Sequence, residues 1–259
     1  MTDTPPPPDD PRGAHGPGSP EWARQLTELN VEQPEGRRAE LRRMAAAARR
    51  LIDGMVMTDA SDDELAAAAT VLEEVADRFD RSLHPARRTL WEGYGEAATS
   101  GNPHGFFDHS PMLGAANPIA PPIVLRAVDE RTMEGTVTFG AAYEGPPGNV
   151  HGGFVAAAFD EVLGAVQSLS GQPGMTGTLT VRYRSPTPLH EPLRFTGRFD
   201  GVDGRKVLTS GTVHAGDRLC AESEAVFIAI DFARMTELRR RRAEQEARRR
   251  GVGGEAEPG

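Results

Sequence analysis

The sequence predicts an α+β fold in which an antiparallel β-sheet wraps around one central helix. Every residue from Phe154 to Phe159 is apolar or alanine, inside a segment of helix-forming composition that covers about 153–168. Because this segment has no polar side at its start, we expect the helix to be buried on nearly all sides. Before and after it, the period of the apolar residues changes from helical spacing to two.

Five segments have this period of two or a run of β-forming residues. They are 133–139, 178–184, 193–199, 207–213 and 219–230. The pairs Asp203-Gly204 and Gly216-Asp217 separate the last three segments and are typical of hairpin turns. The predicted order is therefore strand, helix and then a meander of strands.

The part of the chain before the sheet is predicted to contain two helices, at 35–52 and 61–83. The second begins with Ser61 and has Glu64 three residues later, which is the pattern of a capping box. Apolar residues then recur at helical spacing over 65–79. We expect a helical hairpin that is too thin to form a large core of its own.

Composition divides the chain into four parts. Residues 1–20, with four consecutive prolines, are predicted to be a disordered tail. Residues 21–104 form the helical extension and 105–232 the α+β domain. The last part, 233–259, is a charged tail with two arginine runs, which we interpret as a solvated helix.

Several function classes are disfavoured. The net charge of −9 argues against nucleic acid as a partner, and a single cysteine, Cys220, excludes an internal disulfide and a Cys-rich zinc site. Gly93, Gly95 and Ala98 match part of a dinucleotide fingerprint but follow no predicted strand. The histidines have no metal-ligand spacing, so we expect no metal. Without an apolar stretch of 18 residues, we expect a cytoplasmic protein and no membrane partner.

The start of the buried helix carries the chemistry. Its first N–H groups have no helical partner, and Gly152 and Gly153 allow a ligand to approach them, so they suit an oxyanion hole. Asp160 is then a candidate general base or nucleophile. It follows Gly152 by eight positions, about 12 Å along a helix. One substrate carbonyl cannot reach both groups within a chain, so we predict at least a dimer with shared sites.

Each of these residues also has a purely structural interpretation. A His-Gly-Gly sequence is a common turn, and Asp160 can be an ordinary solvated helix residue, with Glu161 an equally plausible neighbour. Their joint occurrence around an apolar helix favours the functional interpretation, since a buried carboxylate is costly without a purpose or a partner.

The segment 144–160 resembles the active-site signature of PaaI-like hotdog-fold acyl-CoA thioesterases. It is most similar to the group that contains the human mitochondrial thioesterase known as the C-terminal modulator protein. The resemblance covers about 106–232, includes Ser110-Pro111, Asn117-Pro118 and 120–122, and leaves the first 100 residues unexplained.

The resemblance implies roles for individual residues. Asp160 matches the catalytic acid, His151 the histidine that opens the signature, and Gly152 the glycine whose N–H polarises the thioester carbonyl. Thr176, at the start of the next strand, matches an assisting threonine. The residues implied in holding coenzyme A or the substrate are Asn149, Gly153, Arg182, Arg184, Arg205 and Lys206.

Two further expectations concern this site. By the period of two, Arg182 and Arg184 should project from the same strand face as Thr176. Many relatives carry Asn or Gln where this chain has Gly145, which leaves open how the catalytic water is oriented.

The resulting hypothesis is a hotdog domain, paired edge to edge as a homodimer or as a tetramer of two dimers, that hydrolyses acyl-CoA without a cofactor. Phe154, Leu163 and Phe227 are predicted to set the depth of the acyl pocket. Two alternatives stay open: a non-catalytic acyl-CoA sensing module, and a hotdog hydratase. The hydratase is disfavoured because its carboxylate would lie at the helix start.

Overall fold

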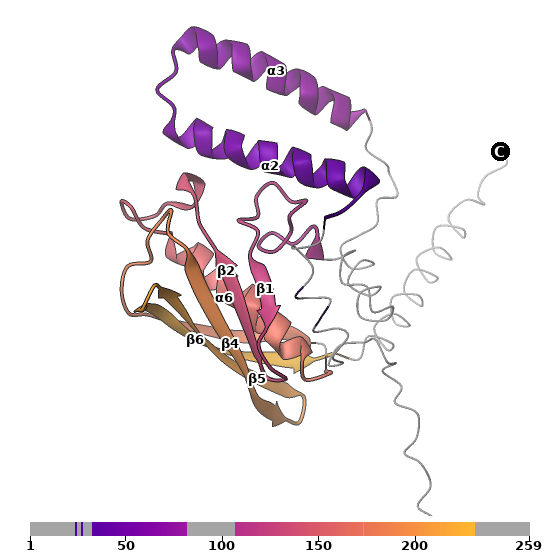
Figure 1. The fold of residues 1–259 in the computed structure, drawn as a ribbon, viewed down its shortest axis with the longest axis vertical. Helices are drawn as coiled ribbons and strands as arrows, with labels where there is room; N and C mark the ends of the chain where they lie inside the picture. Colours follow the sequence, from indigo (N-terminus) through magenta and orange to yellow (C-terminus); the bar gives the residue numbers. More distant parts are fainter. Residues whose placement is uncertain (1–23, 25–26, 28–32, 82–106, 173, 231–259) are drawn as a thin grey trace, which may run out of the picture.

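The structure is a computed structural model that describes residues 24, 27, 33–81, 107–172 and 174–230 (Figure 1). The predicted tails at 1–20 and 233–259, and the glycine motif at Gly93, lie outside these residues. Within the described part of the chain, no helix is long and apolar enough to cross a membrane.

A six-stranded antiparallel sheet forms the domain, with strand order β1-β2-β4-β5-β6-β3. Its strands are β1 (Val124–Ala127), β2 (Thr132–Val137), β3 (Gly174–Tyr183), β4 (Leu193–Asp203), β5 (Lys206–Ala215) and β6 (Arg218–Ala229). The predicted α+β fold is confirmed, and each of the five predicted strand segments overlaps one of the strands β2 to β6. β1 was not predicted, because its four residues are too few to show an alternation.

The sheet curves around the central helix α6 (Gly152–Ser168), which runs across its concave face (Figure 1). Phe159 of α6 packs edge to face on Phe195 of β4, with ring centroids 5.1 Å apart. One side of the helix is not covered by the sheet: Gly153 and Phe154 are exposed and Asp160 is half-buried. The expectation that α6 is buried on nearly all sides is therefore wrong at its first turn, because the curved sheet covers only one side.

Glycines in the sheet set how closely α6 approaches it. A Cβ atom at Gly197 of β4 would lie 2.7 Å from Val166 Cγ2, and one at Gly135 of β2 would lie 2.9 Å from Val162 Cγ2. Real side chains do not tolerate such contacts, so these positions must lack a side chain for the helix to pack at this distance.

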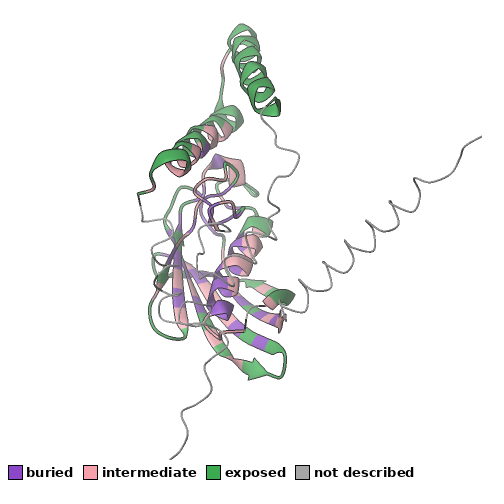
Figure 2. Cartoon of the chain, turned by 90° about the vertical axis from the view of Figure 1, so that its right-hand side faces the viewer, coloured by how far each residue is buried: buried purple, intermediate pink, exposed green. Residues whose placement is uncertain are grey.

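The two predicted N-terminal helices are present as α2 (Gly36–Met57) and α3 (Asp62–Asp80). The capping box is confirmed: Ser61 accepts the Glu64 N–H, and the Glu64 carboxylate accepts the Ser61 N–H. α2 lies against the domain, whereas α3 has no buried residue and lies beyond α2, green along its whole length in Figure 2.

Polar contacts fix α2 to the loop that precedes β1. Arg38 and Arg42 both pair with the buried carboxylate of Asp108. Further along the helix, Arg49 donates to the carbonyl of Asn117 at 2.9 Å. Near its end, Asp53 Oδ1 accepts the N–H of Ala142 at 3.1 Å. These contacts hold α2 against the domain along much of its length.

We predict that Gly197→Ala lowers the free energy of unfolding by about 1–3 kcal/mol, because the added methyl group overpacks the contact with Val166. Gly201→Ala is the matched control on the same strand, since a Cβ there meets no atom within 4 Å. Urea denaturation of both variants measures the difference. Equal stability of the two variants would contradict close packing at Gly197.

Candidate functional site

The loop before α6 is held in one conformation by its own backbone. Gly145 N–H donates to the Asn149 carbonyl, and Asn149 N–H donates to the Pro146 carbonyl. Gly148 adopts φ +74°, a conformation that glycine takes without strain. A Cβ at Gly145 would lie 2.6 Å from His151 Cα, so glycine is required there for the loop to pass His151. This contact gives Gly145 a structural role.

His151 caps the N-terminus of α6. Its ring atom Nδ1 accepts the Gly153 N–H at 3.0 Å, while its carbonyl accepts the Phe154 N–H at 2.9 Å. Among the described residues, the Gly152 N–H has no hydrogen-bond acceptor. The cap therefore uses the donor of Gly153 and leaves that of Gly152 for a ligand. The predicted role of Gly153 in substrate binding stays a prediction, and it cannot use this donor while the cap is formed.

Tyr183, at the end of β3, contacts the first residue of α6. Its hydroxyl donates to the Gly152 carbonyl at 2.7 Å, and a Cβ at Gly152 would lie 3.2 Å from that hydroxyl oxygen. Tyr183 was not among the predicted site residues. The available signal was its position in the alternation with Leu179 and Val181, which places it on the helix side of the strand.

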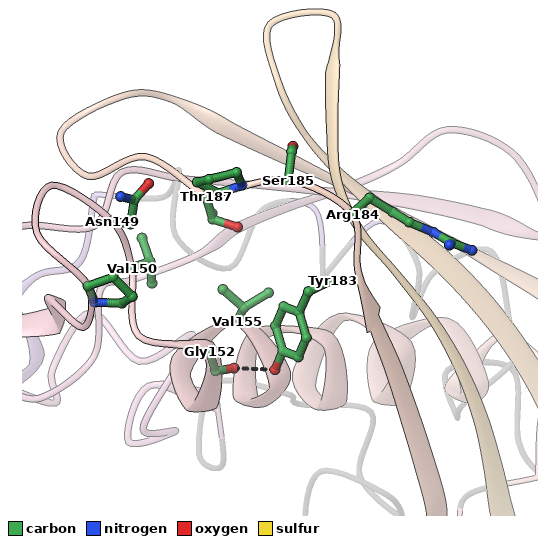
Figure 3. A pocket seen from close by; sticks show the side chains of 10 residues that line it. Asn149, Val150, Gly152, Val155, Tyr183, Arg184, Ser185 and Thr187 are labelled. Atoms are coloured by element: carbon green, nitrogen blue, oxygen red, sulfur yellow. Dashed lines mark hydrogen bonds between the residues drawn. The ribbon is translucent and has the colours of Figure 1, made fainter.

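A cavity of about 400 Å³ opens beside Gly152 and Tyr183 (Figure 3). Asn149 and Arg184, both predicted to bind substrate, line it. Asn149 Nδ2 donates to the Pro147 carbonyl at 2.9 Å, so the side chain is fixed within the loop. In Figure 3 the Arg184 side chain extends away from the bond between Gly152 and Tyr183.

Asp160 and Thr176, both predicted to be catalytic residues, are in direct contact. The Thr176 hydroxyl donates to Asp160 Oδ1 at 2.7 Å, which joins the middle of α6 to the beginning of β3. Among the described residues, Asp160 makes no other hydrogen bond and no ion pair. The carboxylate is thus oriented by one neutral donor and keeps acceptor capacity for a water or a substrate.

The prediction that Arg182 and Arg184 share a strand face with Thr176 is wrong. The register of β3 on β6 shifts between Thr176 and Thr178, so a bulge at Gly177 reverses which residues face α6. Arg182 pairs with Glu224 at 3.1 Å and Arg184 with Glu222 at 2.7 Å, on the side of the sheet away from the helix. Their predicted role in substrate binding stays a prediction.

Arg205 and Lys206 lie at the same end of the sheet as Thr176. Lys206 of β5 and Met175 of β3 are both register partners of Ile228 on β6. Arg205 donates to the Ala229 carbonyl through its guanidinium. The candidate residues thus form two groups, at opposite ends of a strand that spans about 30 Å.

One group contains Gly152, His151 and Asn149 beside the end of β3, and the other contains Asp160 and Thr176 beside its beginning. α6 is continuous between Gly152 and Asp160, so about 12 Å of helix separates them. The two groups do not form one site within the chain.

Glu161, the alternative to Asp160, has a different environment. It accepts a hydrogen bond from the buried hydroxyl of Ser110 at 2.8 Å. Burial raises the pKa of Glu161 to about 7; the Ser110 hydrogen bond lowers it and the charge of Asp160 raises it. Ser110 also accepts the N–H groups of Met112 and Leu113, so Glu161 belongs to the packing of this loop on α6.

Two of the three residues predicted to set the acyl pocket belong to the core. Leu163 is 0% and Phe227 2% exposed, and neither lines a cavity described here. Phe154, by contrast, is exposed and lines a second cavity. As for metals, no group of three His, Cys, Asp or Glu side chains suited to hold one occurs among the described residues.

Comparison with known proteins gives consistent matches. Residues 147–224 match the family described as the thioesterase superfamily. A crystal structure of a thioesterase superfamily protein is 36% identical, with a TM-score of 0.64, and the match covers 73% of this chain and 90% of that one.

Two curated relatives are similar over part of the chain. Acyl-coenzyme A thioesterase THEM4 of Xenopus laevis is 36% identical over 103 residues, 39% of this chain and 46% of that protein. Acyl-coenzyme A thioesterase THEM5 of Homo sapiens is 30% identical over 95 residues, 36% of this chain and 38% of that protein. The chain therefore spans less than half the length of these curated relatives.

We predict that the stability of the protein falls as the pH rises through the raised pKa of Glu161. The folded state favours the protonated carboxyl, so its stabilisation is complete below the ordinary pKa near ~4.3 and is lost as the pH rises past about 7. Glu161→Gln keeps a neutral group and should be more stable than wild type at pH 8, by at most about 4 kcal/mol.

Thermal unfolding at pH 4, 6 and 8 measures this difference. Glu130→Gln, which removes the same charge from an exposed position, is the control. If the difference in Tm between wild type and Glu161→Gln does not increase with pH, Glu161 is already ionised in the folded protein.

Proposed function

This chain belongs to the thioesterase superfamily, and from that premise we propose that it hydrolyses an acyl-CoA thioester to a carboxylic acid and coenzyme A. The observation that carries the proposal is the free N–H of Gly152 at the N-terminus of α6, next to a cavity. A donor at this position suits a carbonyl oxygen that gains negative charge. The names of the curated relatives support acyl-CoA as the substrate class.

The proposed reaction uses Asp160 as the general base. A water molecule attacks the thioester carbonyl carbon while Asp160 accepts its proton, and the oxyanion forms against the Gly152 N–H. When the C–S bond breaks, the coenzyme A thiolate leaves and takes a proton, which Asp160 can return. Asp160 acting directly as a nucleophile is the variant of this scheme, with an acyl-carboxylate anhydride that water then hydrolyses.

We place each reaction site between two subunits. Among the described strands β3 is an edge strand that pairs with β6 alone, and so it can pair with β3 of a second copy. Antiparallel pairing about a two-fold axis would bring the Asp160 end of one strand to the Gly152 end of the other. The 12 Å separation within a chain then stops being an obstacle, because Gly152 of the partner subunit supplies the oxyanion donor.

The same pairing suggests where coenzyme A binds. Arg205 and Lys206 lie on the Asp160 side of a site, and Asn149 and Arg184 on the side that the partner would supply. Guanidinium and ammonium groups suit the phosphates of coenzyme A. Arg182 and Arg184 already pair with glutamates, so their contribution would require an exchange of partners.

We predict that Asp160→Asn lowers kcat about 10²–10⁴-fold while binding of acyl-CoA persists, because the amide cannot accept the proton. Release of free thiol from acetyl-, dodecanoyl- and phenylacetyl-CoA measures turnover, and calorimetric titration measures binding. Tight binding without turnover in wild type on every substrate would replace this proposal with the non-catalytic sensing module.

We also predict that Gly152→Pro lowers kcat about 10²–10³-fold, because it removes one oxyanion donor. Gly152 is the first residue of α6, where proline is well tolerated, and His151 has the extended conformation that precedes proline. Gly152→Ala is the matched control: it adds a Cβ against Tyr183 but keeps the N–H. If alanine and proline reduce kcat equally, the Gly152 N–H is not the donor.

A further inference from the structure

A second, larger cavity lies between α2, the loop before β1 and the exposed side of α6. Its volume is about 760 Å³, within the range of roughly 300–1,000 Å³ that is usual for ligand sites. Its apolar lining includes Ala46, Ile52, Met112, Ile119, Tyr143 and Phe154. Four prolines of the loop, at positions 111, 118, 121 and 122, complete this surface.

The cavity adjoins the reacting groups of α6 on both sides. Phe154 and Ala157, which line it, lie within about one turn of Gly152 and of Asp160 respectively. Ala157 and Asp160 are three residues apart and so lie on the same side of the helix. The wall residue Tyr143 is also bonded to the cap, since its carbonyl accepts the His151 N–H at 2.9 Å.

Three of the five polar side chains that line the cavity already form hydrogen bonds, and Arg50 and Thr138 are the other two. Arg49 donates to the carbonyls of Ala115 and Asn117, and the Tyr143 hydroxyl donates to the Ile119 carbonyl at 2.8 Å. Asp53 accepts the Ala142 N–H. With these hydrogen bonds formed, the wall offers a ligand mainly carbon surface, which favours an uncharged, apolar occupant.

Helix α2 makes this cavity, and it is held in place. The stretch of α2 that lines the cavity includes Ala46, Ile52 and Asp53. Before this stretch, α2 is anchored by the ion pairs of Arg38 and Arg42 with Asp108, and at its end by the hydrogen bond of Asp53. A wall fixed in this way is present before a ligand arrives, so little conformational entropy is lost on binding.

We propose that this cavity binds the acyl chain of the substrate, a fatty acyl group of medium or long length, and that helix α2 of the extension is its outer wall. The inference rests on the proposed function, since it assigns the acyl part of the acyl-CoA. The thioester then lies beside Asp160 in the middle of α6, with the acyl chain running from Ala157 along Phe154 towards α2.

The test compares two tryptophan variants of neighbouring alanines. Ala46→Trp adds an indole where α2 lines the cavity, whereas Ala47→Trp adds the same side chain at the next position, which is also exposed but does not line it. We expect Ala46→Trp to lower kcat/KM for dodecanoyl-CoA by about tenfold or more relative to butanoyl-CoA. Ala47→Trp should keep the wild-type ratio of the two substrates.

A chain-length ratio that is the same in Ala46→Trp and wild type, with both active, would overturn the acyl-site assignment and leave the proposed function standing. If wild type hydrolyses no acyl-CoA, the proposed function fails, and binding decides the cavity separately. Calorimetry with Asp160→Asn as background should then show weaker binding of dodecanoyl-CoA, but not of free coenzyme A, when Ala46→Trp is added. Unchanged binding of both would overturn the assignment.

Discussion

The separation of Gly152 from Asp160 along an unbroken helix is the constraint on which the proposed site depends. α6 is one continuous helix from Gly152 to Ser168. Because each helical residue adds a fixed rise, about 12 Å along the axis separates the Gly152 N–H from the Asp160 carboxylate within one chain. A reaction that needs both groups must obtain one of them from a second copy of the chain.

Different contacts position Gly152 at the beginning of α6 and Asp160 in its middle. At the beginning, the ring of His151 accepts the Gly153 N–H, and Tyr183 binds the Gly152 carbonyl, so the position of Gly152 is fixed while its N–H stays free. Further along, Thr176 orients Asp160. β3 contributes one residue to each set of contacts. It is also an edge strand of the described sheet, so a second copy of the chain can pair with it.

Local patterns in the sequence predicted the helix, five strands, two turns and the capping box, because each depends on residues close together in the chain. The resemblance implied catalytic roles for Asp160 and Thr176, and the structure brings the two side chains into contact, although their roles stay a prediction. The bulge at Gly177 was missed, although an isolated glycine within a strand is its usual signal, and this one residue reversed the predicted side of Arg182 and Arg184.

Other features could not be predicted, because they depend on tertiary contacts. One of them is the hydrogen bond from the Gly153 N–H to the His151 ring, which leaves Gly152 without its neighbour as a second donor. The cavity beside α2 requires Arg38, Arg42 and Arg49 to reach groups that lie some 66–70 residues away in the sequence.

Complementation between two inactive variants tests the shared site most directly. Asp160→Asn and Gly152→Pro are unfolded together, refolded as an equal mixture, and assayed for free-thiol release from the preferred acyl-CoA. If each site joins two subunits, mixed dimers contain one intact site, and the mixture should recover about a quarter of wild-type activity. Activity no higher than that of either variant alone, with mixed dimers demonstrated by differently tagged chains, would contradict the account.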